Sequence, residues 1–258
     1  MGVYFQPEDD GLTMRESGRW VAEKLDYLKR YIDVFETSMR NKWPRRCYID
    51  LFAGPGKCRC RETGAIHLGS PLLALSSEYP FTDYVFVDSD PATIDTLKQR
   101  CQASPYFGRI QFIVGDANQS AAQVVQYLQG IPSLNLAFLD PEGLELHWNT
   151  VAMLARISRL DLIIHYSQMG LSRFMPVEIG NPMVTTVDKF FGDDQWRAIY
   201  LRYSQGEEQF LHRQLMDHYK RKLLGLGYQK TRDVGDEPLM RNAKNAPLYR
   251  LLFASKHP

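Results

Sequence analysis

Five short apolar runs, separated by turns and helical stretches, constrain the fold of this chain more than any other feature. Runs of this length suit strands that are buried on both faces of a sheet. The first run stops at Ala53-Gly54-Pro55-Gly56, because glycine and proline in series interrupt regular structure. The expected strands cover residues 47–52, 84–88, Ile110–Val114, Leu134–Leu139 and Leu160–Tyr166.

Helical stretches lie between these runs and around them. Apolar residues recur at helical spacing over 19–39, ahead of the first strand, and predict an amphipathic helix there. Ser70-Pro71 and Asp90-Pro91 each place a capping side chain before a proline at the first helical position, which favours a helix start. Further helices are expected over residues 70–78, after 90, and over 121–128, 150–157, 187–203 and 207–224.

The alternation of strands and helices predicts an α/β fold, in which a mostly parallel sheet carries helices on both faces. The chain closes with residues 227–234 and 248–254, which are expected to form a terminal antiparallel pair of strands. This layout resembles the Rossmann-like fold of class I methyltransferases, although periodicity alone also fits a generic doubly wound domain. We expect an N-terminal helical extension over 1–45 and a main domain over 46–258, with a helical elaboration at about 171–225.

Composition narrows the class of protein without identifying a partner. At 258 residues, with 44% hydrophobic and 24% charged residues, the chain is typical of one large globular domain. The net charge of +1 means that a nucleic-acid partner would need a local basic face. No apolar run approaches the roughly 20 residues that cross a bilayer, and the polar residues 1–10 do not resemble a signal peptide. We therefore expect a cytoplasmic protein with no membrane partner.

The turn after the first strand predicts part of a ligand site, because doubly wound sheets bind ligands beyond the carboxyl ends of their strands. Gly54 and Gly56 let the backbone approach a ligand closely, although a Gly-x-Gly pair alone is often only a tight turn. The third glycine of the dinucleotide fingerprint is missing, and the next helix begins only near Ser70. Both features disfavour a nicotinamide-dependent oxidoreductase.

Acidic residues end the second and third expected strands. Asp88 can accept hydrogen bonds from both hydroxyls of a ribose, with Asp90 left to cap the next helix. Asp116, or a backbone amide beside it, is placed to read an adenine edge, although a single turn of this kind would be unremarkable. Together the strand ends predict S-adenosylmethionine (SAM) as the cofactor. The expected cofactor-binding residues are Asp50, Phe52, Ala53, Gly54, Gly56, Ser70, Asp88, Asp116 and Ala117.

The fourth strand ends in Asp140-Pro141-Glu142, which resembles the Asp/Asn-Pro-Pro-aromatic sequence of enzymes that methylate exocyclic amines of nucleobases. There, the side chain and a backbone carbonyl accept hydrogen bonds from the amine and orient its lone pair toward the methyl group. Glu142 stands where an aromatic residue is usual, so base stacking at that position is lost. Asp-Pro is also a common turn, and only its place after a fourth strand marks it. Asp140, Pro141 and Glu142 are the expected catalytic residues.

Residues 57–61 alternate basic residues with cysteines, so a strand here would put its cations on one face and its thiols on the other. Such a face could meet phosphate, and a solvated loop is an equal alternative. No metal is expected, because no Cys-x-x-Cys pair occurs and Cys47 leads into a buried strand. His165, at the end of the fifth strand, faces either the pocket or, as is commoner for such a residue, the core.

Several of these motifs together resemble the three-Cys-motif partner (TcmP) family, from about Trp20 to the last residue. The resemblance implies a bacterial or phage-associated protein with a methyltransferase-like fold, whose genomic partner carries the three cysteines. The matching residues are 48–56, 69–72, 87–88, 115–118, 138–141, 143–144, 161–166, 190–192 and 249–258.

Two functions are consistent with this resemblance. The first is SAM-dependent transfer of a methyl group to a nitrogen of a nucleobase, in RNA or DNA. The second is a catalytically silent SAM-binding or adaptor protein for the three-Cys-motif partner. Glu142, at a position where the family usually has an aromatic residue, and the near-neutral net charge favour the second function.

Overall fold

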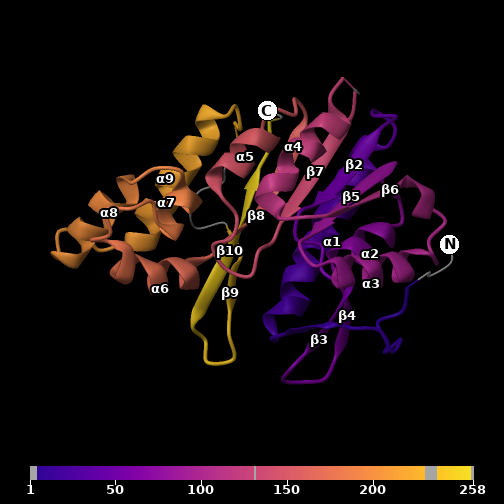
Figure 1. The fold of residues 1–258 in the computed structure, drawn as a ribbon, viewed down its shortest axis with the longest axis horizontal. Coiled ribbons are helices and arrows are strands. Elements are labelled where there is room, and N and C mark those ends of the chain that lie inside the picture. Colours follow the sequence, from indigo (N-terminus) through magenta and orange to yellow (C-terminus); the bar gives the residue numbers. More distant parts are fainter. Residues whose placement is uncertain (1–4, 131, 230–236, 257–258) are drawn as a thin grey trace.

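The computed structural model describes residues 5–130, 132–229 and 237–256. Within them a seven-stranded sheet runs through the molecule in the order β6-β5-β2-β7-β8-β10-β9 (Figure 1). Neighbours from β6 to β8 are parallel, and β10 is antiparallel to both β8 and β9. The strands are β2 (Arg46–Asp50), β5 (Asp83–Asp88), β6 (Ile110–Val114), β7 (Leu134–Leu139), β8 (Leu160–Tyr166), β9 (Leu239–Arg241) and β10 (Pro247–Ala254).

The chain order reverses at β2, which lies between β5 and β7 and is parallel to both. In a doubly wound sheet such a reversal leaves a crevice at the carboxyl ends of the strands. Asp50 is opposite Phe86 on one side and Phe138 on the other. The ends of β2, β5 and β7 therefore lie side by side, where the sequence predicts the ligand site.

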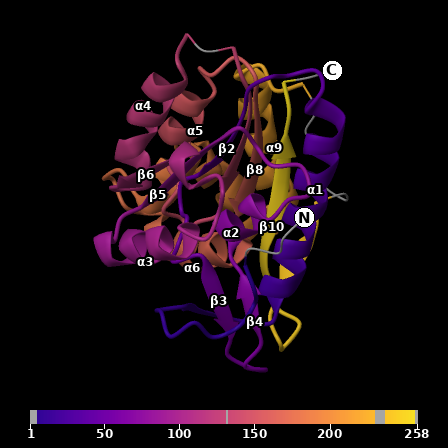
Figure 2. The same ribbon diagram turned by 90° about the vertical axis from the view of Figure 1, so that its right-hand side faces the viewer.

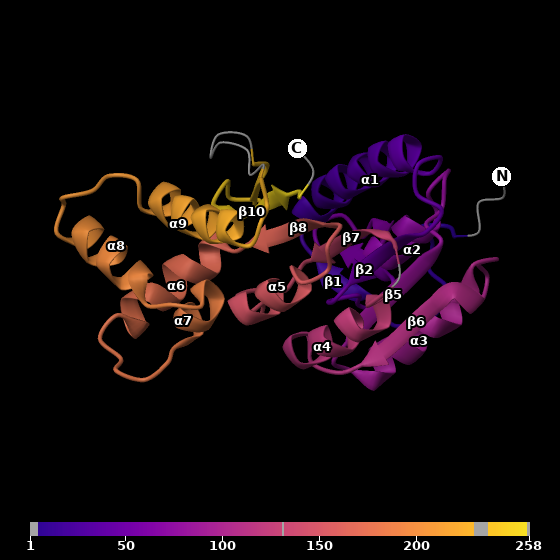
Figure 3. The same ribbon diagram turned by 90° about the horizontal axis from the view of Figure 1, so that it is seen from above.

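Helices cover both faces of the sheet, as the alternation along the chain predicts (Figure 3). Side chains of β2 alternate between the two faces, with Tyr48 in one core and Cys47 and Ile49 in the other. Because both faces are covered, β7 is buried along its whole length, whereas the edge strand β6 is only partly buried. One layer holds α1 (Trp20–Met39), α2 (Ser70–Leu75) and α3 (Pro91–Cys101), and the other holds α4 (Ala117–Leu128) and α5 (Trp148–Leu154).

A helical module, drawn in orange in Figure 1, extends to one side of β8 and β10. The single helix expected over 187–203 is wrong, because Gly192 ends the first of two helices in the left-handed conformation (φ 71°). A Cβ at Gly192 would lie 2.4 Å from the ring of Trp148, so packing also requires glycine there. The module consists of α6 (Gln168–Glu178), α7 (Thr186–Phe191), α8 (Gln195–Ser204) and α9 (Leu211–Gly225).

A small three-stranded sheet lies beyond one end of the main sheet (Figure 2). It consists of β1 (Arg15–Ser17), β3 (Lys57–Cys60) and β4 (Ile66–Leu68). β1 is parallel to β3, with Arg15 opposite Cys58, and β4 is antiparallel to β3. Residues 57–60 thus form a strand and not a solvated loop, and the segment before α1 is joined to the region that follows β2.

The expected bounds of β6, β7 and β8 are confirmed, while other boundaries differ for local reasons. β2 ends at Asp50, earlier than expected, because its Oδ1 accepts a hydrogen bond from the backbone two residues later and starts a turn. α4 begins at Ala117 instead of 121, since Asp116 caps it. The residue before α2 is Gly69, so the prediction that Ser70 caps this helix is wrong.

The terminal antiparallel pair is confirmed, and the strand that pairs with β10 is β9. Residues 227–229 form no strand, although Gln229 N donates a hydrogen bond to Ser255 O (3.0 Å). Residues 230–234 lie outside the described residues.

Within the described ranges, no helix combines the length and the apolar character that crossing a membrane requires. The four cysteines are buried free thiols. In the same part of the chain, no group of three His, Cys, Asp or Glu side chains is arranged to hold a metal ion.

Candidate functional site

The turn after β2 is held by the acidic end of β5. Gly54 has a positive φ (64°), and its N–H donates a hydrogen bond to Asp88 Oδ2 (3.0 Å). Asp88 Oδ1 accepts a hydrogen bond from Asp90 N (3.1 Å), and Asp90 caps α3 by accepting from Ala92 N. Each oxygen of a carboxylate can accept more than one hydrogen bond. The half-buried Asp88 can therefore accept a further hydrogen bond from a hydroxyl group of a ligand.

The two glycines of this turn serve different purposes. A Cβ on Gly56 (φ 91°) would lie 2.8 Å from Leu97 and 3.1 Å from Leu72, so this glycine lets α2 and α3 pack against the turn. The atom nearest to a Cβ on Gly54 is Nη1 of Arg15, at 3.9 Å. Of the two glycines, only Gly54 has room for a Cβ. Gly54 is buried and lies beside the positive charge of Arg15.

Asp50 lies inside the turn and is fully buried. Burial raises the pKa of its carboxyl to about 7, while the Ser70 hydroxyl and the Phe52 N–H act in the opposite direction. Ala53 and Ser70 are buried as well, and Phe52 is half-buried. Phe52 therefore offers a surface to a ligand, whereas Asp50 and Ser70 stabilise the turn from within.

Asp116, which follows β6, is the N-cap of α4. Asp116 Oδ1 accepts hydrogen bonds from the N–H groups of Asn118 (2.9 Å) and Gln119 (3.1 Å). Asp116 is nevertheless exposed, so its carboxylate stays accessible to a ligand, while Ala117 is buried. One carboxylate thus starts α4 and remains available at the edge of the crevice.

Asn118, which sequence reasoning did not single out, joins α4 to the loop that follows β7. Its Nδ2 donates to Glu145 O and its Oδ1 accepts from His147 N, both at 2.9 Å. The Thr150 hydroxyl donates to the same Oδ1 (2.7 Å). The Asn118 side chain therefore positions the loop that begins at Asp140. In the sequence, only its place shortly after Asp116 could have pointed to it.

Asp140 is the most tightly held of the predicted catalytic residues. It is buried, its Oδ1 lies 2.9 Å from His165 Nδ1, and its Oδ2 forms an ion pair with Lys24 of α1. Burial alone would raise the pKa of Asp140, but the Lys24 ammonium and His165 hold that pKa well below its usual range. Asp140 is therefore an anion at neutral pH, and each of its oxygens already has a partner.

Asp140 lines a cavity of about 510 Å³. The His165 ring stacks on Tyr249 of β10, with ring centroids 3.9 Å apart. Trp20 and Lys24 are four residues apart on α1, so both reach the cavity from the same helix face. Aromatic rings and cations thus surround the carboxylate. Arg15, Arg61, Pro141 and Glu142 also line the cavity.

Glu142 differs from the other two predicted catalytic residues. Its side chain is 72% exposed, and its Oε1 lies 2.9 Å from Nη2 of Arg15, whereas Pro141 is buried. Sequence reasoning missed Arg15, Lys24 and Tyr249, because they lie far from Asp140 along the chain. The one available signal was Lys24, a cation in the apolar stripe of the first helix.

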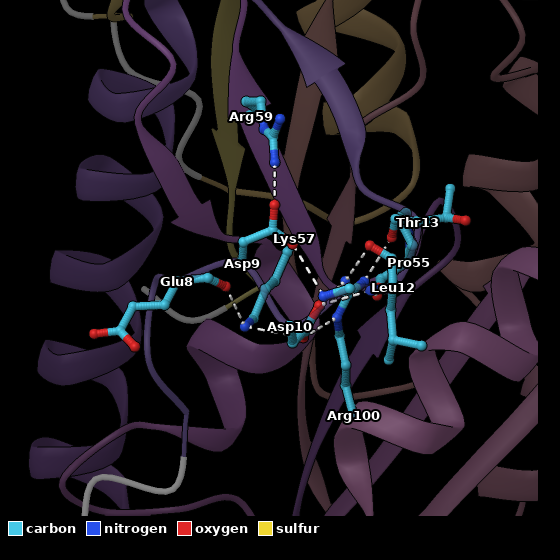
Figure 4. Close-up of polar contacts among 10 residues, drawn as sticks. Glu8, Asp9, Asp10, Leu12, Thr13, Pro55, Lys57, Arg59 and Arg100 are labelled. Carbon is cyan, nitrogen blue, oxygen red and sulfur yellow. Dashed lines mark hydrogen bonds and ion pairs between the residues drawn. The ribbon is translucent and has the colours of Figure 1, made fainter.

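The basic face of β3 meets acidic residues of the N-terminal segment (Figure 4). Lys57 Nζ lies 3.0 Å from Asp10 Oδ2 and donates to Glu8 O (2.8 Å). Arg59 forms an ion pair with Asp9 (2.5 Å). Since Lys57 and Arg59 are paired, these two cations do not support the phosphate-binding face suggested by the sequence. The third cation of that face, Arg61, lines the Asp140 cavity instead.

Two larger hollows lie elsewhere in the described structure. One of about 730 Å³ lies at the amino end of β7 and is lined by Asn135 and Ser158, among others. Another of about 590 Å³ lies in the helical module beside Asp188 and Arg197. Neither contains a predicted site residue, and neither is at the carboxyl ends of the central strands. The candidate site is therefore the Asp140 cavity together with the adjoining strand ends. Of the predicted site residues, Asp140, Pro141 and Glu142 line this cavity, and the predicted cofactor-binding residues do not.

Two solved structures that resemble this chain are methyltransferases. An O-methyltransferase from Bacillus cereus in complex with SAH aligns with 95% of this chain and 85% of its own, with a TM-score of 0.52 and 10% identity. The METTL16 MTase domain aligns with 97% and 76% of the two chains, with a TM-score of 0.49 and 12% identity. The likeness to the Bacillus cereus protein shows the fold, which is the Rossmann-like fold of class I methyltransferases, and it shows nothing further.

No protein-family model and no curated protein matches the chain. The resemblance to the TcmP family therefore stays a prediction.

Proposed function

We propose that this protein is a SAM-dependent methyltransferase that acts on a nitrogen of a nucleobase in RNA or DNA. The observation that carries the proposal is Asp140, a buried anion at the end of β7. It lines a cavity together with Arg15, whose guanidinium also lies near Gly54 of the glycine turn. The fold supports the choice of cofactor, because the Bacillus cereus structure of this fold is in complex with SAH, the product that SAM leaves after transfer.

The donor site in this proposal is the crevice at the ends of β2, β5 and β6. Phe52 and Gly54 face the methionyl end of SAM, Asp88 accepts hydrogen bonds from the ribose, and Asp116 lies at the adenine. The residues present fit the group. A side chain on Gly54 would fill the space between the turn and Arg15, and the acidic groups at Asp88 and Asp116 suit hydroxyl and amine donors.

The acceptor site is the Asp140 cavity. SAM supplies an activated methyl group, so the protein has mainly to align the acceptor nitrogen and hold it. Asp140 and the Pro141 carbonyl accept hydrogen bonds from an exocyclic amine and direct its lone pair toward the donor site. Because its pKa is held low, Asp140 orients the amine and is a poor base. Half-buried Trp20 offers an aromatic surface that Glu142 lacks, while Tyr249 is buried against His165 in the cavity wall.

A second function, a catalytically silent SAM-binding adaptor for a three-Cys-motif protein, is favoured by one observation. The Lys24 ammonium already occupies Oδ2 of Asp140, where an acceptor amine would bind. In an adaptor this ion pair would be permanent and would close the site to an amine.

Transfer of labelled methyl from SAM to total RNA and DNA of a host cell tests the two functions. Wild type and Asp140→Ala are each incubated with and without the three-Cys-motif partner. The proposal expects label in a nucleobase after nuclease digestion, lost in the variant. Wild type that binds SAM but labels no nucleic acid, even with the partner, would favour the adaptor, and label in protein alone would overturn the nucleobase acceptor.

A further inference from the structure

Arg15 lies between the two halves of the candidate site. Its Nη1 is 3.9 Å from the position of a Cβ on Gly54, the residue whose N–H is bound by Asp88. Its Nη2 is 2.9 Å from Oε1 of Glu142, on the loop that follows Asp140. One guanidinium therefore faces the glycine turn with one nitrogen and the acceptor loop with the other.

Two neighbouring cations, Arg100 and Lys57, already have partners (Figure 4). Arg100 of α3 pairs with both oxygens of Asp10 (2.9 and 2.7 Å) and donates to the carbonyl oxygens of Thr13 (2.8 Å) and Pro55 (2.6 Å). Lys57 is buried and is held by Asp10. Neither cation is free to bind an anionic ligand.

The same contacts position Arg15. Arg100 joins Thr13 to Pro55 of the glycine turn, and Arg15 follows Thr13 by two residues in β1, where it is opposite Cys58. The Arg15 side chain remains 39% exposed. These hydrogen bonds fix the N-terminal segment to the glycine turn. They hold the Arg15 guanidinium beside Gly54, where it is still partly exposed.

The carboxylate of SAM needs a cationic partner, because the nearby strand ends carry acidic residues. Asp50, Asp88 and Asp116 all lie at the ends of the strands there, while the methionyl end of SAM carries a carboxylate. We propose that Arg15 binds this carboxylate and that Glu142 holds the guanidinium in place. The inference rests on the proposed function, because it requires SAM in this crevice.

The proposal assigns Glu142 a different task from the aromatic residue usual in the motif. A guanidinium has five N–H donors in a planar fork, so Nη2 can stay with Glu142 while Nη1 binds the carboxylate. Glu142 is then a positioning residue for Arg15, and it touches neither the acceptor nor the methyl group. An acidic residue is the side chain that this position requires.

Calorimetry with two ligands tests the inference. S-adenosylhomocysteine (SAH) carries the amino-acid carboxylate, whereas 5′-methylthioadenosine has the same nucleoside and thioether without it. Arg15→Ala should weaken SAH binding by about 10- to 100-fold, as for a lost charge-assisted hydrogen bond, and should leave 5′-methylthioadenosine within about twofold. Arg15→Lys should recover part of the SAH affinity. Glu142→Gln should weaken SAH by a few-fold and leave 5′-methylthioadenosine unchanged.

Arg19→Ala is the matched control, because it removes an equal charge from an exposed residue close by in the sequence and should change neither affinity. Equal weakening of both ligands in Arg15→Ala would show a structural role and overturn the inference, and so would tighter SAH binding in Glu142→Gln. Wild-type affinity for SAH in Arg15→Ala would overturn it while leaving the proposed function intact. Wild-type protein that binds neither ligand would overturn both.

Discussion

Lys24 of α1 and Asp140 at the end of β7 form an ion pair in the wall of the proposed acceptor cavity. The two side chains are only 15% and 10% exposed. The Lys24 ammonium keeps the buried carboxylate charged, since an uncompensated anion in such a place would take up a proton. An acceptor amine that binds Asp140 must therefore share its oxygens with Lys24 and His165 or displace Lys24 from Oδ2.

Lys24→Met should lower the free energy of unfolding by about 3–5 kcal/mol, because it removes the cation that pairs with the buried Asp140 carboxylate and leaves only the His165 ring beside it. Urea denaturation at pH 7 measures this change, and adding Asp140→Asn should restore much of the loss. Arg30→Met is the control, since its pair with Asp26 is 75% and 52% exposed and is expected to contribute less than about 1 kcal/mol. Similar losses in the two single variants would contradict a buried Lys24–Asp140 pair.

Asp140→Ala should lower the rate of methyl transfer by about 10²–10³-fold, the cost of losing one oriented hydrogen-bond partner in a site that excludes water. SAM affinity should stay nearly intact, because the ribose and adenine contacts lie elsewhere. Asp140→Asn checks that the loss of rate does not come from misfolding. Glu142→Ala should lower the rate of methyl transfer less than either Asp140 variant. A parallel loss of SAM affinity would place Asp140 in the donor site instead.

Asp88→Ala should weaken SAM binding by about 1.5–3 kcal/mol, as for lost hydrogen bonds to a charged group. Isothermal titration calorimetry measures the change. Asp90→Ala is the matched control, since it removes the α3 cap at a cost of about 1 kcal/mol in stability and should not alter the Kd for SAM. If the two variants bind SAM equally well, Asp88 does not contact the ribose.

Asp50→Asn should stabilise the protein at pH 8. The folded-state pKa of Asp50 is raised to about 7 from a usual value of 3.8, so its contribution to stability is complete below pH 3.8 and is lost as the pH rises through 7. The amide removes this loss, on the order of 2–4 kcal/mol at pH 8. Denaturation at pH 5 and pH 8 should show a smaller difference in the variant than in wild type. Asp95→Asn, at an exposed helix position, should leave the wild-type difference unchanged.

Removal of metal should leave the protein intact. Cys58 and Cys60 lack zinc-ligand spacing, and both thiols are buried. Dialysis against EDTA should change neither the Tm nor the affinity for SAM. Stoichiometric zinc in protein prepared in metal-free buffer, lost on Cys58→Ser, would show that this prediction is wrong.

The bounds of β6, β7 and β8 were predictable residue by residue. Each is a mainly apolar run that ends in a polar turn, which is the pattern of a strand in a covered parallel sheet. β9 escaped prediction because it is three residues long, and its pairing with β10 depends on contacts distant in sequence. α4 began earlier than expected because Asp116, taken only as a ligand-binding carboxylate, also caps the helix.

The sequence by itself determined the fold class and the strand ends that form the proposed donor side. Gly54, Asp88 and Asp116 each follow a strand, and parallel strands bring their carboxyl ends to one edge, so chain order was enough to group them. Only the tertiary structure decided the acceptor side. Arg15 and Lys24 come from the N-terminal segment and reach Asp140 and its loop through the β1–β3 pairing and the packing of α1 on the sheet. No local periodicity encodes which cation meets which carboxylate, because that choice depends on how distant elements pack.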